Sequence, residues 1–153
     1  MITMIGLFSH RKLLEVTITC CCLHAAHAQV RISEVMYHPA SENPAEEYVE
    51  LQNVTATNLN LAGWQFTKGI AFTFSNSVPL APGGRIVVVA DTNAFATKYP
   101  TVTNYIGNWT GVLNNSDETI RLEDNLGNLV DEVFCADEGD YATRVRGAQD
   151  YNH

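Results

Sequence analysis

The stretch Glu47-Tyr48-Val49-Glu50-Leu51-Gln52-Asn53-Val54, followed by Gly63-Trp64, decides the fold of this chain. Neighbouring side chains of a β-strand point to opposite faces, so Val49 and Leu51 share one face and the polar residues between them share the other. The segment therefore predicts a strand with one side on a core. Trp64 has the large apolar area that anchors a core between two sheets. Together these residues indicate a β-sandwich module and no catalytic site.

Short segments of this kind recur along the chain, separated by turn-forming residues and without a sustained helical repeat. Seven short strands over roughly a hundred residues are typical of a sandwich, so the predicted fold class is all-β. The one helical candidate runs from Asn93 to Lys98, with Thr92 or Asn93 as its cap. The strands are expected near residues 30–37, 47–54, 64–67, 71–75, 84–91, 118–123 and 129–135.

The core of this sandwich is expected to come from the apolar faces of the strands. In the segment 84–91, Ile86 and Val88 alternate with Val87 and Val89, which indicates a central strand covered on both faces. The residues predicted to form the structural core are Val49, Leu51, Trp64, Ile86, Val88 and Leu122.

Glycine and proline mark the turns between the strands. Pro82-Gly83-Gly84 combines a fixed φ with two permissive residues, which predicts a tight turn into the next strand. Residues 124–128 should form a hairpin with Gly127 in the left-handed conformation. Gly63 should adopt a conformation that a side chain would obstruct. The predicted structural turn residues are Gly63, Pro82, Gly83 and Gly127.

Residues 1–28 have the composition of an export signal. Arg11 and Lys12 precede a mostly apolar run at 13–23, and Ala26-His27-Ala28 ends with the small-x-small pattern that signal peptidase accepts. A membrane anchor or a buried first strand is the alternative, but the run is shorter than the roughly 20 residues that span a bilayer. We expect a signal peptide at 1–28, a sandwich domain at 29–136, and a polar tail or the start of a linker at 137–153.

Charge and reactive residues exclude several classes of protein. The chain has a formal net charge of −8, and the basic residues of the expected domain are scattered, which disfavours nucleic acid as a partner. Cys135 is the one thiol outside the expected signal peptide and should be a small buried apolar residue. His38 and His153 are too few for a zinc site, and no nucleophile elbow or phosphate loop occurs. We expect no enzyme activity, no catalytic or cofactor-binding residue, no metal site and no cofactor.

Acidic residues raise two further questions. A pair of carboxylates could act in a glycosidase, but such a pair needs a cleft, and solvated strand faces explain these side chains better. The acidic candidates for such a pair are Glu34, Glu46, Glu47 and Glu50. The acidic segment at 131–140 offers oxygen ligands that suit Ca²⁺ but lacks the spacing of an EF-hand. Whether it binds calcium stays open. The residues concerned are Asp131, Glu132, Asp137, Glu138 and Asp140.

Several short motifs occur in an order that resembles the lamin-tail domain, over about residues 30–135. The resemblance implies an immunoglobulin-like β-sandwich, found in the tails of nuclear lamins and in many secreted bacterial proteins. Because an export signal precedes it, the chain resembles the secreted bacterial branch. The motifs are Ile32-Ser33-Glu34-Val35 with Pro39, Glu47-Tyr48-Val49-Glu50-Leu51 with Asn53, Leu61-Ala62-Gly63-Trp64, Leu80-Ala81-Pro82-Gly83 before Val87-Val88-Val89-Ala90, Leu113-Asn114-Asn115 before Asp117-Glu118, and Leu122-Glu123-Asp124 with Gly127 and Val130-Asp131.

These observations predict a non-catalytic secreted or cell-surface domain that acts in adhesion or positioning. Its partner would be a protein or an extracellular polymer whose identity the sequence does not give, because sandwich modules host unrelated functions. The alternative is an accessory targeting module of a larger exported hydrolase, with this chain as its amino-terminal fragment, since the resemblance associates such domains with hydrolases. A hydrolase domain in frame downstream would favour the alternative, and a stop codon would favour the first hypothesis.

Overall fold

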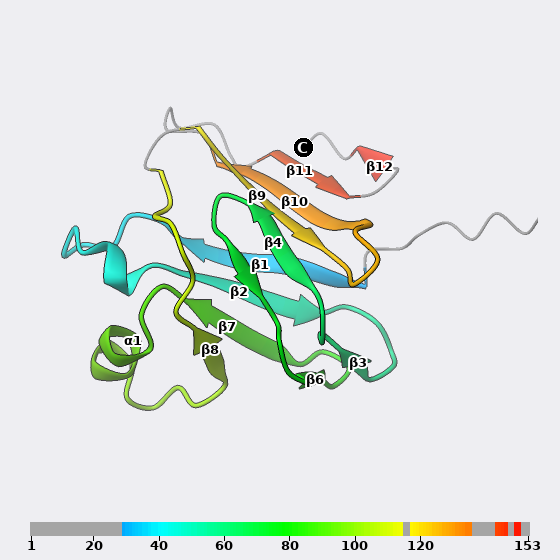
Figure 1. The fold of residues 1–153 in the computed structure, drawn as a ribbon, viewed down its shortest axis with the longest axis horizontal. Coiled ribbons are helices and arrows are strands. Elements are labelled where there is room, and N and C mark those ends of the chain that lie inside the picture. The colour runs from blue at the N-terminus through cyan, green and yellow to red at the C-terminus, as the bar shows by residue number, and fades with distance from the viewer. Residues whose placement is uncertain (1–28, 115–116, 136–142, 147–148, 151–153) are drawn as a thin grey trace, which may run out of the picture.

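The computed structural model describes residues 29–114, 117–135, 143–146 and 149–150 of the chain. The expected signal peptide lies outside the described residues. The described chain forms two stacked β-sheets with one short α-helix at the edge of the stack (Figure 1). The all-β, immunoglobulin-like sandwich predicted from the sequence is therefore confirmed.

The first sheet has four strands and includes one parallel pair. β1 pairs with β2 and β2 pairs with β7 in antiparallel fashion, whereas β7 and β8 run parallel. A parallel neighbour needs a crossover connection, and the helix α1 (Thr92–Lys98) lies in that connection. In spatial order the strands are β1 (Val30–Met36), β2 (Tyr48–Asn53), β7 (Arg85–Val89) and β8 (Tyr105–Gly107).

The second sheet has six strands in antiparallel pairs, and in Figure 1 its strands cross those of the first sheet. In spatial order they are β12 (Gln149–Asp150), β11 (Thr143–Arg146), β10 (Leu129–Cys135), β9 (Glu118–Glu123), β4 (Gln65–Lys68) and β5 (Phe72–Thr73). A separate two-stranded ladder is formed by β3 (Leu59–Asn60) and β6 (Pro79–Leu80). A 3₁₀ turn, η1 (Pro44–Glu46), lies between β1 and β2.

Each of the seven expected segments contains a strand, but the expectation of about seven strands was too low. The structure adds β3, β6, β8, β11 and β12. Strands of two or three residues, such as β3, β6 and β8, are too short to show an alternating pattern in the sequence. β11 and β12 lie within 137–153, where the sequence suggests a tail or linker; β11 pairs along the free edge of β10, whose backbone groups can accept another strand.

The cap of the helix also differs from the sequence prediction. Asp91 caps α1, because its carboxylate accepts hydrogen bonds from the N–H groups of Asn93, at 2.8 Å, and Ala94, at 2.9 Å. Asp91 is an extended residue, as a cap requires, whereas Thr92 and Asn93 are already inside the helix. The predicted helix is confirmed, and its predicted cap was one or two residues late.

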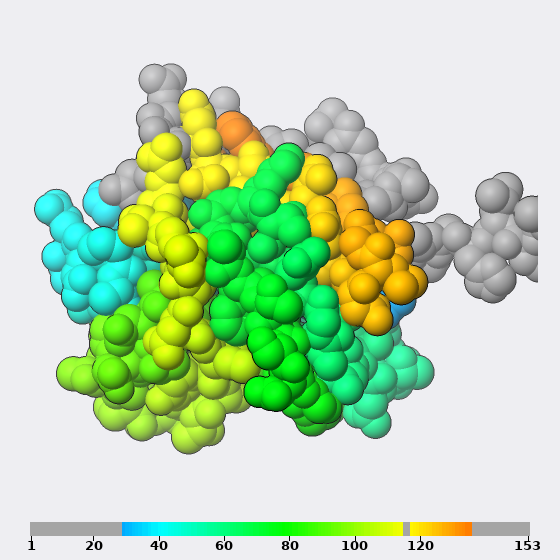
Figure 2. Space-filling view, in the orientation of Figure 1, coloured from blue at the N-terminus to red at the C-terminus, as the bar shows by residue number. Residues whose placement is uncertain are grey.

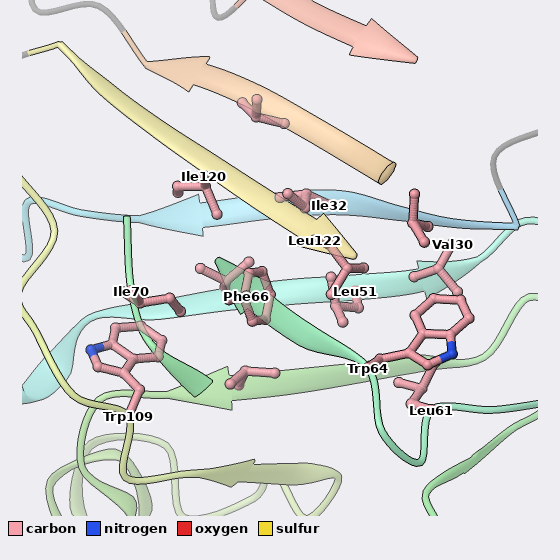
Figure 3. Packing of buried hydrophobic residues seen from close by; sticks show 14 of the residues in the cluster. Val30, Ile32, Leu51, Leu61, Trp64, Phe66, Ile70, Trp109, Ile120 and Leu122 are labelled. Atoms are coloured by element: carbon pink, nitrogen blue, oxygen red, sulfur yellow. The ribbon is translucent and has the colours of Figure 1, made fainter. Parts of the chain in front are cut away.

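The hydrophobic core lies between the two sheets. Figure 3 shows Ile32 and Leu51 of the first sheet facing Phe66, Ile120 and Leu122 of the second. Of the six predicted core residues, five are buried and Ile86 is partly buried and packed against the core. The five buried residues are Val49, Leu51, Trp64, Val88 and Leu122.

Two β-bulges face one another where the sheets meet. The ladder of β1 shifts between Ile32 and Glu34, and that of β10 shifts between Leu129 and Asp131. The shift turns both Val130 and Asp131 toward the interior, where Asp131 is fully buried. Its carboxylate accepts the backbone N–H of Ile32 at 2.7 Å. This hydrogen bond joins β1 of the first sheet to β10 of the second.

The predicted turn residues occupy the turns as follows. Gly83 has a φ of +70° in a turn closed by the Gly84 N–H and the Ala81 carbonyl, at 2.8 Å, with Pro82 before it. A type II turn needs positive φ at that position. Gly127 has a φ of +78° in the hairpin between β9 and β10. Gly63 has a φ of +79°, and a Cβ there would lie 3.0 Å from the Cβ of Asn125.

The segment that follows β8, residues 108–114, crosses from the first sheet to the second and is called the crossing segment below. Figure 2 shows it, in yellow, running beside the β4–β5 hairpin. In this segment Thr110 forms a two-bond bridge with Ala71 at 2.9 and 3.0 Å, and the side chains of Trp109 and Leu113 are buried. This crossing closes the sandwich at the end where β2 begins.

Candidate binding pocket on the outer face of the first sheet

The outer face of the first sheet, which turns away from the second sheet, carries a second hydrophobic cluster. Val87 and Val89 of β7 and Phe95 of α1 are buried there, and Tyr48 and Tyr99 pack against them. β7 is therefore covered on both faces, by the main core on one side and by α1 on the other, as its sequence predicts. The helix covers only part of the sheet, and a pocket lies beside it.

This outer-face pocket has a volume of about 270 Å³. It is lined by residues of β1, β2, β7, α1 and the connection that follows the helix. They are Glu34, Tyr48, Glu50, Arg85, Val87, Phe95, Tyr99, Val102 and Asn104.

Aromatic rings form one wall of the pocket. The centroids of Tyr48 and Phe95 are 5.8 Å apart, and those of Tyr48 and Tyr99 are 5.9 Å apart, both in edge-to-face geometry. Phe95 and Tyr99 lie 4.9 Å apart in a tilted arrangement. Such pairs are favourable beyond the area they bury, so the three rings hold one another in place. The rings give the pocket a largely apolar wall, as is usual in a binding pocket.

Charged groups line the same pocket beside these rings. The Tyr48 hydroxyl donates a hydrogen bond to Glu34 at 2.6 Å, and burial together with this bond raises the pKa of Tyr48 well above its usual value. Glu50 accepts the Ser33 hydroxyl at 2.5 Å and forms an ion pair with Arg85. Two carboxylates and one guanidinium thus line the pocket, which leaves it with an excess of negative charge.

The strand register explains why Glu34 and Glu50 meet. The two residues are direct partners across β1 and β2, and the bulge in β1 keeps Glu34 on the outer face. Like charges directly opposite each other are destabilising in a sheet. Here the hydroxyls of Tyr48 and Ser33 and the guanidinium of Arg85 offset that repulsion. No pattern in the sequence indicates this pairing, because alternation of apolar and polar residues does not reveal a bulge.

The other two acidic candidates lie elsewhere. Glu46 is in η1 and pairs with Lys98 of α1, and Ser41 donates to the same carboxylate oxygen at 2.6 Å. Glu47 is buried before β2 and accepts the N–H of Leu113 at 2.9 Å. The structure therefore brings together Glu34 and Glu50 of the four candidates, and both are engaged in bonds that hold the sheet.

The acidic segment at 131–140 is described only up to Cys135. Asp131 points into the core, whereas Glu132 points out and pairs with Arg121 and Lys68 on the second sheet. These two neighbours lie on opposite faces of β10, so they cannot share one cation. Asp137, Glu138 and Asp140 lie outside the described residues. Within the described residues, no three His, Cys, Asp or Glu side chains are grouped to hold a metal ion.

Cys135 ends β10 and is buried, and burial raises the pKa of its thiol. A raised pKa lowers the fraction of thiolate, which is the reactive form.

No helix in the described part of the chain has the length and hydropathy needed to cross a membrane.

Several important residues were not found from the sequence. Trp109 is a core residue beside Ile70 (Figure 3), in a segment with no strand pattern. Phe95 anchors the outer-face cluster, but a single aromatic in a short helix carries little signal in a sequence. Asp131 looks like a surface residue until the bulge in β10 is known. The alternation of Val87 and Val89 was the one sequence feature that indicated a covered outer face.

The fold and these residues agree with the family comparison. The Lamin Tail Domain family matches residues 24–136, which is most of the chain. The chain therefore belongs to the Lamin Tail Domain family, which is a non-catalytic domain. No curated protein matches the chain.

Proposed function

We propose that this chain is a secreted or cell-surface interaction domain of the bacterial lamin-tail type. It binds a protein or an extracellular polymer and has no catalytic role of its own. The observation that carries this proposal is the outer-face pocket, which is lined by packed aromatic rings together with charged groups. Interfaces concentrate their binding free energy in such aromatic and arginine residues.

The bonding of the pocket's carboxylates supports a binding role over a hydrolytic one. A general acid needs a carboxyl whose environment favours the protonated form, and its partner must be free to act on the substrate. Glu50 instead forms an ion pair with Arg85 and accepts the Ser33 hydroxyl, so it is not free to act on a substrate. Glu34 accepts the Tyr48 hydroxyl. Both groups shape the pocket and hold β1 to β2.

Binding is tested by immobilising the chain and measuring how much of an envelope protein and polymer preparation it retains. Tyr99→Ala removes one aromatic wall of the pocket and should lower retention of a specific partner by about tenfold or more, as hot-spot residues do. Lys68→Ala, on the second sheet, is the matched control and should bind like the wild type. Equal retention by all three proteins would contradict a binding role for this pocket.

Export is tested separately, because it depends on residues 1–28 alone. The chain is expressed with its first residues intact, and the amino terminus of the protein recovered outside the cytoplasm is determined by mass spectrometry. The proposal expects a mature chain that begins at Gln29. Full-length protein retained in the cytoplasm would contradict export and would leave the binding test unaffected.

A further inference from the structure

A second cavity lies at the end of the sandwich where β2 begins. It has a volume of about 390 Å³ and shares no lining residue with the outer-face pocket. The connection between β1 and β2 forms one side of it, and Val112 and Leu113 of the crossing segment form the other. Glu47, Glu42 and His38 line it together with apolar residues.

Glu47 is the distinctive group of this cavity, because its carboxyl is buried without a counter-ion. The residue is 3% exposed, and one carboxylate oxygen accepts the N–H of Leu113 at 2.9 Å. Within the described residues, its other oxygen, Oε1, accepts no hydrogen bond and the carboxylate has no ion pair. Burial raises the pKa of Glu47. A buried carboxylate is costly when no cation compensates it, so the cavity favours a positively charged occupant.

The geometry selects among cations. A divalent metal ion needs several oxygen or nitrogen ligands, and the described residues hold no group of three that could supply them. A guanidinium binds best to both oxygens of a carboxylate at once, but Leu113 already occupies one of the two. An ammonium group is a compact point charge that one free oxygen can accept.

The remaining walls suit the rest of such a ligand. Pro39, Val112 and Leu113 give the cavity apolar surface, against which an alkyl stem can pack while its charged head reaches the carboxylate. Glu42 lines the same cavity and adds negative charge. We propose that this cavity binds a primary ammonium group on a short alkyl stem, with the free oxygen of Glu47 as its acceptor. The ligand is either a free alkylamine or a lysine side chain of a polypeptide.

The test is a titration of the isotope-labelled full chain followed by NMR. Probes are n-butylammonium, for a free amine, and Nα-acetyl-lysine N-methylamide, for a lysine side chain. Nα-acetyl-arginine N-methylamide and sodium chloride are compared at the same ionic strength. The proposal expects a saturable shift of the Leu113 amide with either ammonium probe. The ammonium probe that binds more tightly identifies whether the ligand is a free alkylamine or a lysine side chain. Shifts that do not saturate, or equal affinity for the arginine probe, would overturn it.

Two further measurements separate binding at Glu47 from a merely structural role. Glu47→Gln keeps an acceptor for the Leu113 N–H but removes the charge, and should weaken ammonium binding by about tenfold or more, as loss of a charged hydrogen bond does. Glu123→Gln, on the second sheet, is the control of equal charge change. Unchanged affinity in Glu47→Gln would overturn the proposal.

The wild-type chain supplies a test that does not depend on any variant folding. Binding of an ammonium group favours the charged carboxylate, so a saturating probe must lower the pKa of Glu47, followed at its own side-chain carbon. His38, Glu42 and Tyr37 also line the cavity, and reading the titration at Glu47 itself keeps their ionisation apart. An unchanged pKa of Glu47 at saturation would overturn the proposal. The outer-face pocket is not involved, so its function is tested independently.

Discussion

The two faces of the first sheet are built from the same strands but differ in what they bury. The inner face presents Val49, Leu51 and Val88 to a continuous core shared with the second sheet. The outer face has a small cluster around Phe95, and beside it a pocket with charged groups. The stability of the domain therefore depends mainly on the inner face. The outer face can change its side chains, and hence its ligand, at a lower cost in folding free energy.

The largest effect should come from the centre of the inner face. Leu51 is fully buried, and Leu51→Ala removes apolar contacts and leaves a cavity between the sheets. We expect a loss of about 2–5 kcal/mol in the free energy of unfolding, measured by urea denaturation. Leu126→Ala is the matched control, because Leu126 is 80% exposed and its truncation should change stability by less than about 0.5 kcal/mol. Similar losses in both variants would contradict a core between the sheets.

The polar end of the inner face should give the next largest effect. Asn53 is buried on the same face as Leu51, and its amide donates to the carbonyls of Thr57, Leu80 and Ala81 at 2.8 to 3.0 Å. Asn53→Ala leaves these carbonyls without their donor, which should cost roughly 1–3 kcal/mol. Hydrogen exchange should also accelerate at Thr55, whose N–H donates to the Asn53 side chain at 2.9 Å. Unchanged exchange there would argue against this network.

The outer face should respond more weakly, beginning with the helix that covers it. Asp91→Ala removes the cap of α1 and should cost about 1 kcal/mol, with partial rescue by Asp91→Ser. The sequence alone suggested Thr92 or Asn93 as the cap, so Asn93→Ala separates the second of these assignments from Asp91. The structure expects Asn93→Ala to be nearly neutral in thermal denaturation. A larger loss in Asn93→Ala than in Asp91→Ala would restore the sequence assignment.

The same division between faces explains what the sequence could predict. Alternating apolar residues, as at 47–54, follow directly from burial of one face of a strand, so the inner face and the fold class could be predicted from the sequence. A positive φ that favours glycine is also a local requirement, so the turns at Gly83 and Gly127 could be predicted as well.

The candidate site was harder to predict from the sequence, because it depends on contacts between residues far apart in the chain. The meeting of Glu34 with Glu50 follows from a bulge, and the aromatic wall follows from where α1 packs on the sheet. Strand alternation places Glu47 on the face of Val49 and Leu51 and Glu50 on the outer face, but it does not give their partners. Those partners, the N–H of Leu113 for Glu47 and Arg85 for Glu50, lie more than thirty positions away, which no local pattern records.

The smallest effect should come from the ion pair that fastens η1 to α1 beside the outer face. The hydrogen bond from Lys98, and then that from Ser41, lowers the pKa of Glu46 below its ordinary value of 4.5. A carboxyl whose pKa is lowered by folding stabilises the folded state above its ordinary pKa, and this contribution is lost as the pH falls through the folded value.

We therefore expect Glu46→Gln to be slightly less stable than the wild type at neutral pH, and the two proteins to converge in acid below the ordinary pKa of the carboxyl. Denaturation at several pH values measures this convergence, and added salt should reduce the difference at neutral pH, since the pair faces solvent. Lys98→Met should show the same pattern, because it removes the other half of the pair. If the difference persisted in acid, the pair would be holding the turn through packing and not through charge. The outer face would then be stabilised by apolar packing, as the inner face is.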